Sequence, residues 1–373
     1  MPLSAVAIRN YRSVRNLWLP VEQLSVFVGA NGVGKTNLYK ALALLRRAAD
    51  GTITRAIAEE GGLDSVLWAG PRSDRKPMRL VLKARFDELE YAGEMGLPHS
   101  YEIEIGLPQP TEAAFPLEPL VKAERREIVM MERKGPLVTL RNDDGKRESH
   151  QAAVLSSETA LASFRDGARY PELEAVRREM LEWRLYHDFR TDAGSPIRRP
   201  CHAITTPTLS PDGHDLAAVL ATLSVIREDT AELDAAIDDA FPGGRLEAGD
   251  EGSWCRVSLT FPDMPRSFAV HELSDGTLKY LCLLGALMGY RLPPLIALNE
   301  PETSLHPSLL APLARRLASA AGHTRIWIVT HSEDLAGHLQ QETGKRARRV
   351  VKPAGATGIE GLKLSGEYAD EDE

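Results

Sequence analysis

The chain has 373 residues, of which 43% are hydrophobic and 26% are charged. Its 45 basic and 53 acidic side chains give a net charge of −8. This balance is typical of a soluble globular protein of roughly two structural units, and it excludes wholesale disorder and a generally basic protein that coats nucleic acid. The three cysteines are far apart and form no metal-binding or disulfide pattern, so we expect a cytoplasmic protein. Arg291 and two prolines interrupt the most apolar segment, so we expect no membrane span.

The first predicted elements are a strand, a glycine-rich loop and a helix. Leu24 to Gly29 is a short apolar run that ends in glycine, which indicates a buried strand. After the loop, Lys35 to Ala49 carries Leu38, Leu42 and Leu45 at helical spacing. We therefore predict strand, loop and helix in immediate succession.

The next segment predicts an antiparallel pair of strands. Hydrophobic residues alternate with basic ones from Met78 to Phe86 and with acidic ones from Tyr101 to Ile105. Period-two alternation is typical of strands, and opposite charges on facing strands attract modestly. A further hairpin is predicted around Glu127 to Arg141, with its turn at Lys134 to Pro136.

After this hairpin, a helix is predicted near residue 180. Leu173, Val176, Met180 and Trp183 mark one face of that helix. The segment that follows is polar and interrupted by prolines, which favours an inserted subdomain over a continuation of the sheet.

The last third of the chain alternates between helices and strands. Predicted helices lie at Leu216 to Ile226, Thr230 to Phe241, Thr277 to Gly289 and Leu305 to Leu317, the last with Pro307 in its first turn. Predicted strands lie at Ser253 to Phe261, Ser267 to His271, Leu295 to Leu298 and Arg325 to Val329. Such alternation favours a parallel sheet covered on both faces.

These elements divide the chain into four parts. We expect an N-terminal part of a core domain at residues 1–106, with an antiparallel lobe. An insert of β-hairpin and helices follows at 107–205, and the core domain resumes at 206–365. The acidic tail, residues 366–373, is expected to fray.

Residues Gly29 to Thr36 match the phosphate-binding pattern G-x-x-x-x-G-K-[ST] in full. Glycines let the backbone wrap a phosphate with its N–H groups pointing inward, and the N-terminus of the following helix adds its dipole. Lys35 would reach the β- and γ-phosphates of a nucleotide, and Thr36 would ligate Mg²⁺. The alternative is a chance glycine-rich turn, but the flanking strand and helix are the context that the motif requires.

A second polar site is predicted at the end of the strand Leu295 to Leu298. Asn299 and Glu300 follow directly, at the sheet edge where ligands bind in open α/β sheets. A carboxylate there can accept a proton from an attacking water, which makes Glu300 the candidate general base. The alternative is a strand that ends in an ordinary acidic turn.

Two further segments are weaker signals when each is taken alone. Ser274 suits the N-cap position of the predicted helix that follows, and Gly276 allows a close backbone approach. His331 follows the last buried strand and should therefore lie at the same sheet edge as Glu300. A helix cap and a structural histidine are the respective alternatives.

In this order, the four elements resemble the ABC-type ATPase heads of the SMC, RecF and overcoming-lysogenization-defect proteins. Gly29 to Thr36 matches Walker A, and Leu273 to Thr277 looks like the signature motif. Leu295 to Glu300 matches Walker B, and His331 matches the switch histidine. The run Asn299 to Pro307 is similar to that of stand-alone ATPases of the AAA_21 type.

The resemblance covers residues 1–106 and 206–365, and it implies an α/β P-loop head with a mostly parallel sheet, an antiparallel β lobe and a helical insert. The opening segment, Ile8 to Ser13, also resembles the N-F-R-S segment of these heads. Nothing in residues 107–205 contributes to the resemblance.

The resemblance also implies that ATP and Mg²⁺ bind and that two heads dimerise around ATP. The signature of one subunit would complete the site of the other, with Ser274 and Gly276 on the γ-phosphate. The implied nucleotide-binding residues are Arg12, Asn31, Gly32, Gly34, Lys35, Thr36, Asn37, Ser274 and Gly276. The implied metal-binding residues are Thr36 and Asn299, and the implied catalytic residues are Glu300 as general base, His331 on the γ-phosphate and Lys35.

The sequence departs from the family pattern in Walker B and in the Q-loop. Walker B normally ends in Asp-Glu, and here Asn299 takes the place of the aspartate. An amide removes one negative charge near the metal, so we expect weak metal binding or slow turnover. No glutamine lies between Gln23 and Gln109, and the loop Leu67 to Gly70 is the candidate replacement for the Q-loop glutamine. No long coiled coil, zinc hook or Toprim-type nuclease domain is visible.

Two functions stay open at this point. The first is a slow Mg²⁺-dependent ATPase that couples its nucleotide state to DNA or to a co-encoded effector protein, in DNA repair or anti-phage defence. The second is a nucleotide-gated binding module with negligible hydrolysis, which Asn299 favours. Metal-dependent phosphate release distinguishes them.

Three basic clusters are candidates for a DNA-binding surface: Lys122 to Lys134, Arg177-Arg178 with Arg198-Arg199, and Lys345 to Lys352. The residues Lys345, Arg346, Arg348 and Arg349 are the first choice. DNA binding through them should be stronger with ATP and should fall steeply with salt. The alternative for each cluster is an ordinary solvated face.

Overall fold

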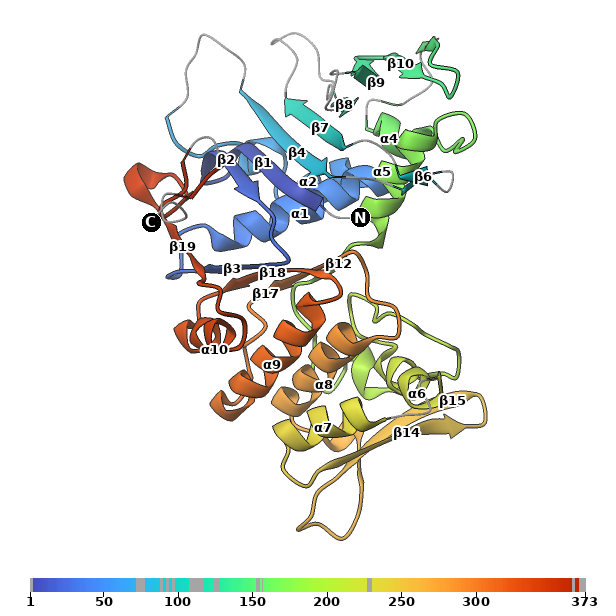
Figure 1. Cartoon of the computed structure of the whole chain (residues 1–373), viewed down its shortest axis with the longest axis vertical. Coiled ribbons are helices and arrows are strands. Elements are labelled where there is room, and N and C mark those ends of the chain that lie inside the picture. Colours follow the sequence, from blue (N-terminus) through green and yellow to red (C-terminus); the bar gives the residue numbers. More distant parts are fainter. Residues whose placement is uncertain are drawn as a thin grey trace. The chain divides into compact units, whose positions relative to one another are not determined.

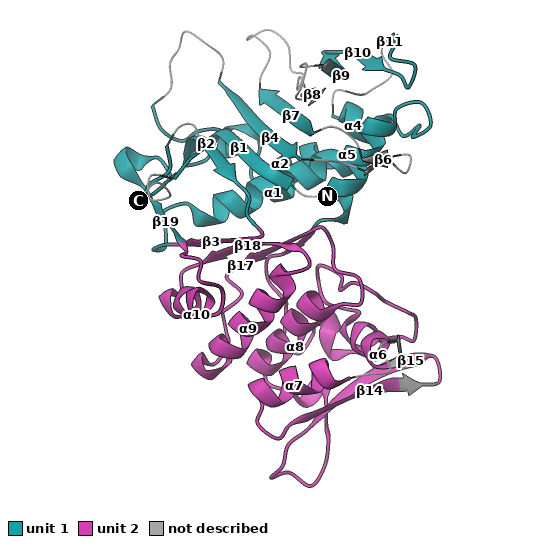
Figure 2. Ribbon diagram, viewed as in Figure 1, with its two compact units in different colours: residues 1–22, 29–183, 348–373 teal, residues 23–28, 184–347 magenta. Residues whose placement is uncertain are grey.

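The structure is a computed structural model that describes residues 3–71, 78–87, 90–91, 94–95, 98–106, 117–123, 128–151, 155, 157–226, 230–363 and 366–368. The chain forms two compact units, coloured teal and magenta in Figure 2. Unit 1 comprises Met1–Glu22, Gly29–Trp183 and Arg348–Glu373, and unit 2 comprises Gln23–Val28 and Arg184–Ala347. Both units therefore join segments that are distant in the sequence.

Unit 1 contains an eight-stranded antiparallel sheet in the order β11-β10-β9-β8-β7-β4-β1-β2 (Figure 1). Its strands are β1 (Leu3–Tyr11), β2 (Val14–Pro20), β4 (Arg79–Phe86), β7 (His99–Gly106), β8 (Leu117–Ala123), β9 (Ile128–Lys134), β10 (Leu137–Arg141) and β11 (Arg147–Gln151). Two short strands, β5 (Glu90–Tyr91) and β6 (Glu94–Met95), form a separate pair.

The predicted charge pairing between β4 and β7 is confirmed. Lys83 lies opposite Glu102, and an Arg79 Nη1 atom lies 3.6 Å from Oε2 of Glu104. The apolar residues of β4 alternate with these charges and are buried, as period-two patterning requires. The predicted hairpin also forms, since β9 and β10 pair across a two-residue turn at Gly135, where φ is +56°.

Helices α2, α4 and α5 of unit 1 pack against α1, whose apolar residues Leu38, Leu42 and Leu45 are buried as predicted, and α3 packs against α2. These helices are α1 (Lys35–Asp50), α2 (Ile53–Glu59), α3 (Leu63–Val66), α4 (Ala160–Ser163) and α5 (Pro171–Glu182). Near the C-terminus, β19 (Arg348–Val351) and β20 (Gly358–Ile359) pair antiparallel on either side of a short 3₁₀ helix, η4 (Pro353–Gly355).

Unit 2 is built on a parallel sheet in the order β12-β17-β18-β3. Its strands are β12 (Arg184–Tyr186), β17 (Leu295–Asn299), β18 (Arg325–Thr330) and β3 (Leu24–Val28). Side chains of β17, β18 and β3 are buried almost without exception, because a parallel sheet is covered by other elements on its faces. The strands β3, β17 and β18 therefore share one parallel sheet, and the α/β P-loop fold that the resemblance implies is confirmed.

The helices of unit 2 are α6 (Leu216–Ile226), α7 (Ala231–Ala240), α8 (Asp275–Met288), α9 (Leu310–Ala321) and α10 (Glu333–Thr343). Helices α9 and α10 contact the parallel sheet, and α8 packs between α9 and α6. A small antiparallel sheet contacts α6 and comprises β13 (Cys201–His202), β15 (Trp254–Thr260), β14 (Arg245–Glu251) and β16 (Phe268–Ala269). Three 3₁₀ helices complete the unit: η1 (Pro196–Arg198), η2 (Val270–Glu272) and η3 (Pro307–Leu309).

Several predicted boundaries are corrected by the structure. The helix predicted from Leu305 begins as η3 at Pro307 and becomes α-helical only at Leu310, because the proline and the His306 side chain organise a tighter first turn. The strand predicted to reach His271 ends at Ala269, where η2 takes over. The β1–β2 hairpin and helix α10 were not predicted.

The segment predicted to be an insert is only partly described. Strand β8 pairs with β7, and β9 pairs with β8, so residues 117–123 and 128–151 continue the antiparallel sheet of unit 1. Residues 107–116, 124–127, 152–154 and 156 lie outside the described part of the chain, as do residues 369–373 of the predicted acidic tail. No helix in the described segments is long and apolar enough to cross a membrane.

Candidate functional site

The phosphate-binding loop follows β3 directly and ends where α1 begins. Gly32 and Gly34 have φ values of +83° and +97°, a region that favours glycine. A Cβ atom on Gly34 would collide with the Thr357 hydroxyl and would lie 2.5 Å from Oγ of Ser13. Gly34 is thus required both for its conformation and for the close approach of two other segments.

Those two segments clamp the loop through hydroxyl groups. The Thr357 hydroxyl donates to the Val33 carbonyl at 2.7 Å and lies 2.7 Å from Oγ of Ser13. Asn37 donates from its side-chain amide to Ser13 at 2.7 Å, and the Thr357 N–H donates to the Ser13 carbonyl at 2.7 Å. Ser13 and Thr357 therefore hold the loop in shape, and neither was predicted from the sequence.

Lys35 lies at the first position of α1 with its ammonium group buried against the loop. Its Nζ donates to the carbonyls of Gly29 at 2.6 Å and Ala30 at 2.8 Å. The first turn of α1 carries no acidic residue, so the helix dipole favours an anion there. Thr36 lies in the same turn, and Asn31 and Gly32 are exposed on the loop.

Arg12, which the resemblance assigned to the nucleotide, is bonded to an acidic residue of its own unit. Its guanidinium donates twice to Oε2 of Glu60, at 3.0 and 2.6 Å, and its φ is +49°. Asn37 is likewise engaged, with Ser13. Nucleotide contacts by Arg12 and Asn37 stay predictions. To contact a nucleotide, the Arg12 guanidinium would also have to stay bonded to Glu60 or leave it, and the Asn37 amide likewise with Ser13.

In unit 2, the ends of neighbouring strands bring Glu300 and His331 together. Glu300 follows β17 with a φ of +48°, and its N–H donates to the Val329 carbonyl at 2.7 Å. His331 follows β18, and its Nδ1 lies 3.7 Å from Oε1 of Glu300. Val28 pairs with Thr330, so β3 ends at the same edge before the chain enters the glycine-rich loop. Positive φ in a non-glycine residue is costly and is frequent at functional sites.

Glu302 is a residue of this edge that sequence reasoning missed. Its side chain is 5% exposed, and Oε1 accepts hydrogen bonds from the Thr330 hydroxyl at 2.6 Å and the His331 N–H at 3.1 Å. The same oxygen lies 3.1 Å from Nδ1 of His331. The Glu302 carboxylate therefore lies directly beside the imidazole ring of His331. The available signal was a second acid two positions after Glu300, within the acidic turn that is the alternative interpretation of this segment.

Asn299, the residue in place of the expected aspartate, is buried at the end of β17. Its Oδ1 makes no hydrogen bond within the described residues. A buried acceptor without a donor costs about 1–3 kcal/mol, so the position fits a donor such as a metal-bound water. The described residues contain no cluster of three His, Cys, Asp or Glu side chains suited to a metal.

Helix α8 contributes a buried cation to the same region of unit 2. Lys279 has its Nζ 3.9 Å from Oδ1 of Asp188. Burial lowers the pKa of the Lys279 ammonium, and nearby carboxylates, Glu302 and Glu300 among them, oppose that shift. Lys279 therefore connects the helix of the signature motif electrostatically to the Walker B carboxylates.

The signature segment begins α8 as predicted. The Ser274 hydroxyl caps the helix by accepting from the Thr277 N–H at 3.2 Å. A Cβ atom on Gly276 would lie 2.8 Å from the Ser304 carbonyl oxygen, and Ser304 itself has a φ of +66°. The absence of a side chain at Gly276 thus lets the first turn of α8 lie close to the loop that contains Ser304 in the same chain.

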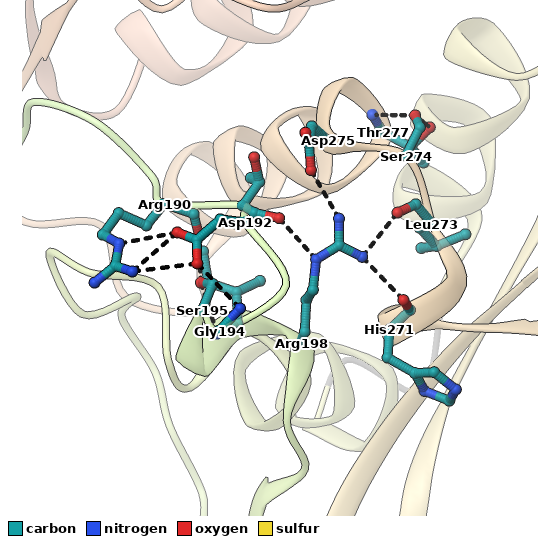
Figure 3. Close-up of polar contacts among 12 residues, drawn as sticks. Arg190, Asp192, Gly194, Ser195, Arg198, His271, Leu273, Ser274, Asp275 and Thr277 are labelled. Atoms are coloured by element: carbon teal, nitrogen blue, oxygen red, sulfur yellow. Dashed lines mark hydrogen bonds and ion pairs between the residues drawn. The ribbon is translucent and has the colours of Figure 1, made fainter.

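Arg198, from a distant part of the sequence, forms hydrogen bonds to the segment that precedes and begins α8 (Figure 3). Its guanidinium donates to the His271 and Leu273 carbonyls at 3.0 and 2.9 Å and to Oδ1 of Asp275 at 2.7 Å. Its Nε donates to the Thr191 carbonyl at 2.7 Å, and only 13% of the side chain is exposed. The sequence placed Arg198 in a basic surface cluster, but its donors are bound to the main chain around the signature.

The other predicted basic clusters are also largely paired. Arg177 and Arg178 lie 2.6 and 4.0 Å from Glu174 and Glu182, respectively. In the favoured cluster, Arg348 lies 3.3 Å from Glu22 and Arg349 lies 3.9 Å from Glu360. Residues 124–127 of the first cluster lie outside the described part of the chain. These pairings reduce the free positive charge that the clusters offer to DNA.

Comparison with known proteins gives a family and a fold. The family model described as "AAA domain, putative AbiEii toxin, Type IV TA system" matches residues 24–336. The SMC head bound to the C-winged helix domain of ScpA is 12% identical with a TM-score of 0.59, over 98% of this chain and 99% of that chain. The Smc head with an extended coiled coil, bound to the C-terminal domain of ScpA from Pyrococcus furiosus, is 11% identical with a TM-score of 0.52, over 98% and 97%. No curated protein matches. The fold is that of an SMC-type, ABC-type ATPase head.

Proposed function

This chain belongs to the AAA_21 family of AAA-domain ATPases, and from that premise we propose that it is an ATP-binding, Mg²⁺-dependent ATPase whose two heads dimerise around ATP. The observation that carries the proposal is the pair of Glu300 and His331 at the carboxyl edge of the parallel sheet. The strand β3 ends at that edge and leads directly into a complete phosphate-binding loop.

In the proposed reaction, the loop Gly29 to Thr36 holds the phosphates and Lys35 neutralises their charge. Glu300 accepts the proton of the attacking water, and His331, oriented by Glu302, contacts the γ-phosphate. Mg²⁺, when bound through Thr36 and, by way of a water, Asn299, would supply positive charge that stabilises the transferring phosphoryl group.

The signature would act on the nucleotide of the partner head through Ser274 and Gly276. The N-terminus of α8 favours an anion, but Asp275 in its first turn adds a negative charge that would repel phosphate. Arg198 neutralises the charge of Asp275 at 2.7 Å and bonds to the preceding main-chain carbonyls. It therefore holds the conformation of the segment and removes the repulsion between Asp275 and a phosphate.

Replacing Arg198 with alanine is expected to lower kcat by up to about a hundredfold, because a displacement of the signature by about 1 Å misplaces the phosphate. ATP binding to the Lys35 loop of the isolated head should stay within a few-fold of the original. Titration with a fluorescent ATP analogue and steady-state phosphate release separate the two effects.

Arg198→Lys keeps the charge but loses the forked hydrogen bonds, so it should restore activity only in part. Arg190→Ala is the matched control, since Arg190 is an exposed residue of the same loop whose side chain pairs with Asp192. An Arg198→Ala protein with unchanged kcat would show that the contact to the signature is not needed for the reaction.

Replacing Asn299 with aspartate is expected to lower the Mg²⁺ concentration needed for half-maximal activity by about tenfold or more. The added carboxylate attracts the metal, but without metal it brings a buried charge close to Glu302. The melting temperature should therefore fall in EDTA and recover with Mg²⁺ and ATP. A Mg²⁺ requirement equal to that of the unchanged protein would place Asn299 away from the metal.

A second candidate is a nucleotide-gated binding module with negligible hydrolysis. The buried amide of Asn299, in place of a carboxylate, is the observation that favours it. Phosphate release from the purified full chain with ATP, in Mg²⁺ and in EDTA, separates the two candidates. Light scattering with and without ATP tests dimerisation, and a chain that stays monomeric while it hydrolyses ATP would contradict the proposed coupling.

The proposed partners are DNA or a co-encoded effector protein, in DNA repair or anti-phage defence in the cytoplasm. The similar SMC heads were each solved with a domain of ScpA, which supports a protein that docks on the head. The chain's three cysteines are free thiols, which is consistent with a reducing compartment.

A further inference from the structure

Two neighbouring cavities in unit 2 share a wall made by Arg199 and Pro200. One has a volume of about 210 Å³ and the other about 500 Å³. Both border the small sheet of β13, β15 and β14, and neither involves the phosphate-binding loop of unit 1. They are therefore separate from the phosphate-binding loop, although Arg198, which lines the smaller cavity, also holds the segment before α8.

The smaller cavity is lined by positively charged groups. Arg198, Arg199 and Arg256 line it together with His271, and none of its lining residues is acidic. Arg198 is held by the signature segment, but the exposed guanidinium of Arg199 makes no side-chain hydrogen bond or ion pair within the described residues. In a chain of net charge −8, this grouping favours an anion, and a guanidinium fork matches the oxygens of phosphate.

The larger cavity is lined by an exposed aromatic pair. Trp254 is 45% exposed, and its ring stacks on His202 with centroids 4.6 Å apart and an interplanar angle of 20°. The two residues lie opposite each other on β15 and β13, so the strand pairing itself holds the stack in place. A flat, solvent-accessible indole is a platform on which a nucleobase can stack.

We propose that these joined cavities bind a nucleotide unit, with its phosphate on Arg199 and its base on the Trp254–His202 stack. The ligand is either a free nucleotide or one unit of a single-stranded nucleic acid. A base inside a duplex is already stacked on its neighbours and cannot lie against the indole, so duplex DNA does not fit. The proposal does not depend on ATP hydrolysis, because Arg199, Trp254 and His202 are not among the residues proposed to bind or hydrolyse ATP.

The test is a titration of the full chain carrying Lys35→Ala, so that the phosphate-binding loop does not contribute. The probes are a fluorescein-labelled single-stranded oligothymidylate, followed by anisotropy, and dTMP as its competitor. Trp254→Ala should weaken oligonucleotide binding about tenfold, and Trp254→Phe should restore most of it because a ring is retained. Arg199→Ala should weaken binding and reduce the slope of log K against log salt by about 0.7.

Arg245→Ala is the matched control, because Arg245 is an exposed arginine of the same sheet that lines neither cavity. The same titration on the unaltered chain without ATP, with Arg199→Ala and Trp254→Ala made in that chain, provides a second measurement that does not depend on the folding of the Lys35→Ala protein. Competition by dTMP identifies free nucleotides as ligands, and binding of the oligonucleotide alone identifies a single strand; both results support the site. Absence of binding, equal affinity for duplex, or indifference to both Arg199→Ala and Trp254→Ala would overturn it.

Discussion

Replacing Glu300 with glutamine is expected to slow ATP hydrolysis by about 10²–10⁴-fold while ATP binding is retained. Glutamine has the same shape but cannot take a proton from water, so the reaction loses its proposed base and little else. The half-exposed side chain makes few contacts whose loss would unfold the protein. Because hydrolysis separates the heads in the proposed cycle, the variant should accumulate as an ATP-bound dimer.

Single-turnover phosphate release and size-exclusion chromatography with ATP measure these two effects. Glu342→Gln is a suitable control, since Glu342 is a partly exposed acid of the same unit whose Arg315 partner lies 3.9 Å away. If the Glu300→Gln protein hydrolyses ATP at the original rate, then the assignment of Glu300 as the base is wrong.

Replacing Lys35 with alanine is expected to reduce the rate of phosphate release by at least about 10²–10³-fold. This is the usual effect of removing one preorganised group that stabilises charge in the transition state. The ammonium group is held against the loop by the Gly29 and Ala30 carbonyls, so its position is set before a nucleotide arrives. Loss of these two hydrogen bonds from a charged donor should lower stability by about 1.5–3 kcal/mol each. ATP affinity, measured by titration calorimetry, should fall together with the rate.

Lys40→Ala provides the comparison, because Lys40 lies on the same helix and faces Glu60 at 3.8 Å. It should bind and hydrolyse ATP as the unaltered chain does. A Lys35→Ala protein that keeps its melting temperature and also keeps full activity would remove the phosphate-binding loop from the mechanism.

The parts of the fold that could be predicted are those whose residues lie close together in the sequence or follow a regular strand pattern. The loop Gly29 to Thr36 needs a strand before it and a helix after it, and all three lie within one stretch of chain. Glu300 and His331 could be placed at one edge because parallel strands end together. The pairing of β4 with β7 followed from alternating charge and burial. The β1–β2 hairpin was missed because β1 is buried on both faces and shows no clean alternation.

The parts that could not be predicted depend on contacts between distant segments. Arg198 looks like a surface cation in the sequence, and only the fold shows its donors on the His271 and Leu273 carbonyls, more than 70 residues away. Glu302 lies in the acidic turn after β17, and the burial of its carboxylate cannot be seen in the sequence because it depends on the Thr330 hydroxyl beside it. The type of a charged side chain does not show whether it is solvated at the surface or bonded within a functional site.

The clamp on the phosphate-binding loop also has a consequence for the timing of synthesis. Thr357 bonds to Val33 across 324 positions and to Ser13 across 344. At about 5–20 residues per second, the ribosome makes Thr357 roughly 15–65 s after the loop itself. During that interval the nascent chain carries the whole Walker A motif without the hydroxyl that shapes it, so the capture of ATP is postponed until the far end of the fold has been made.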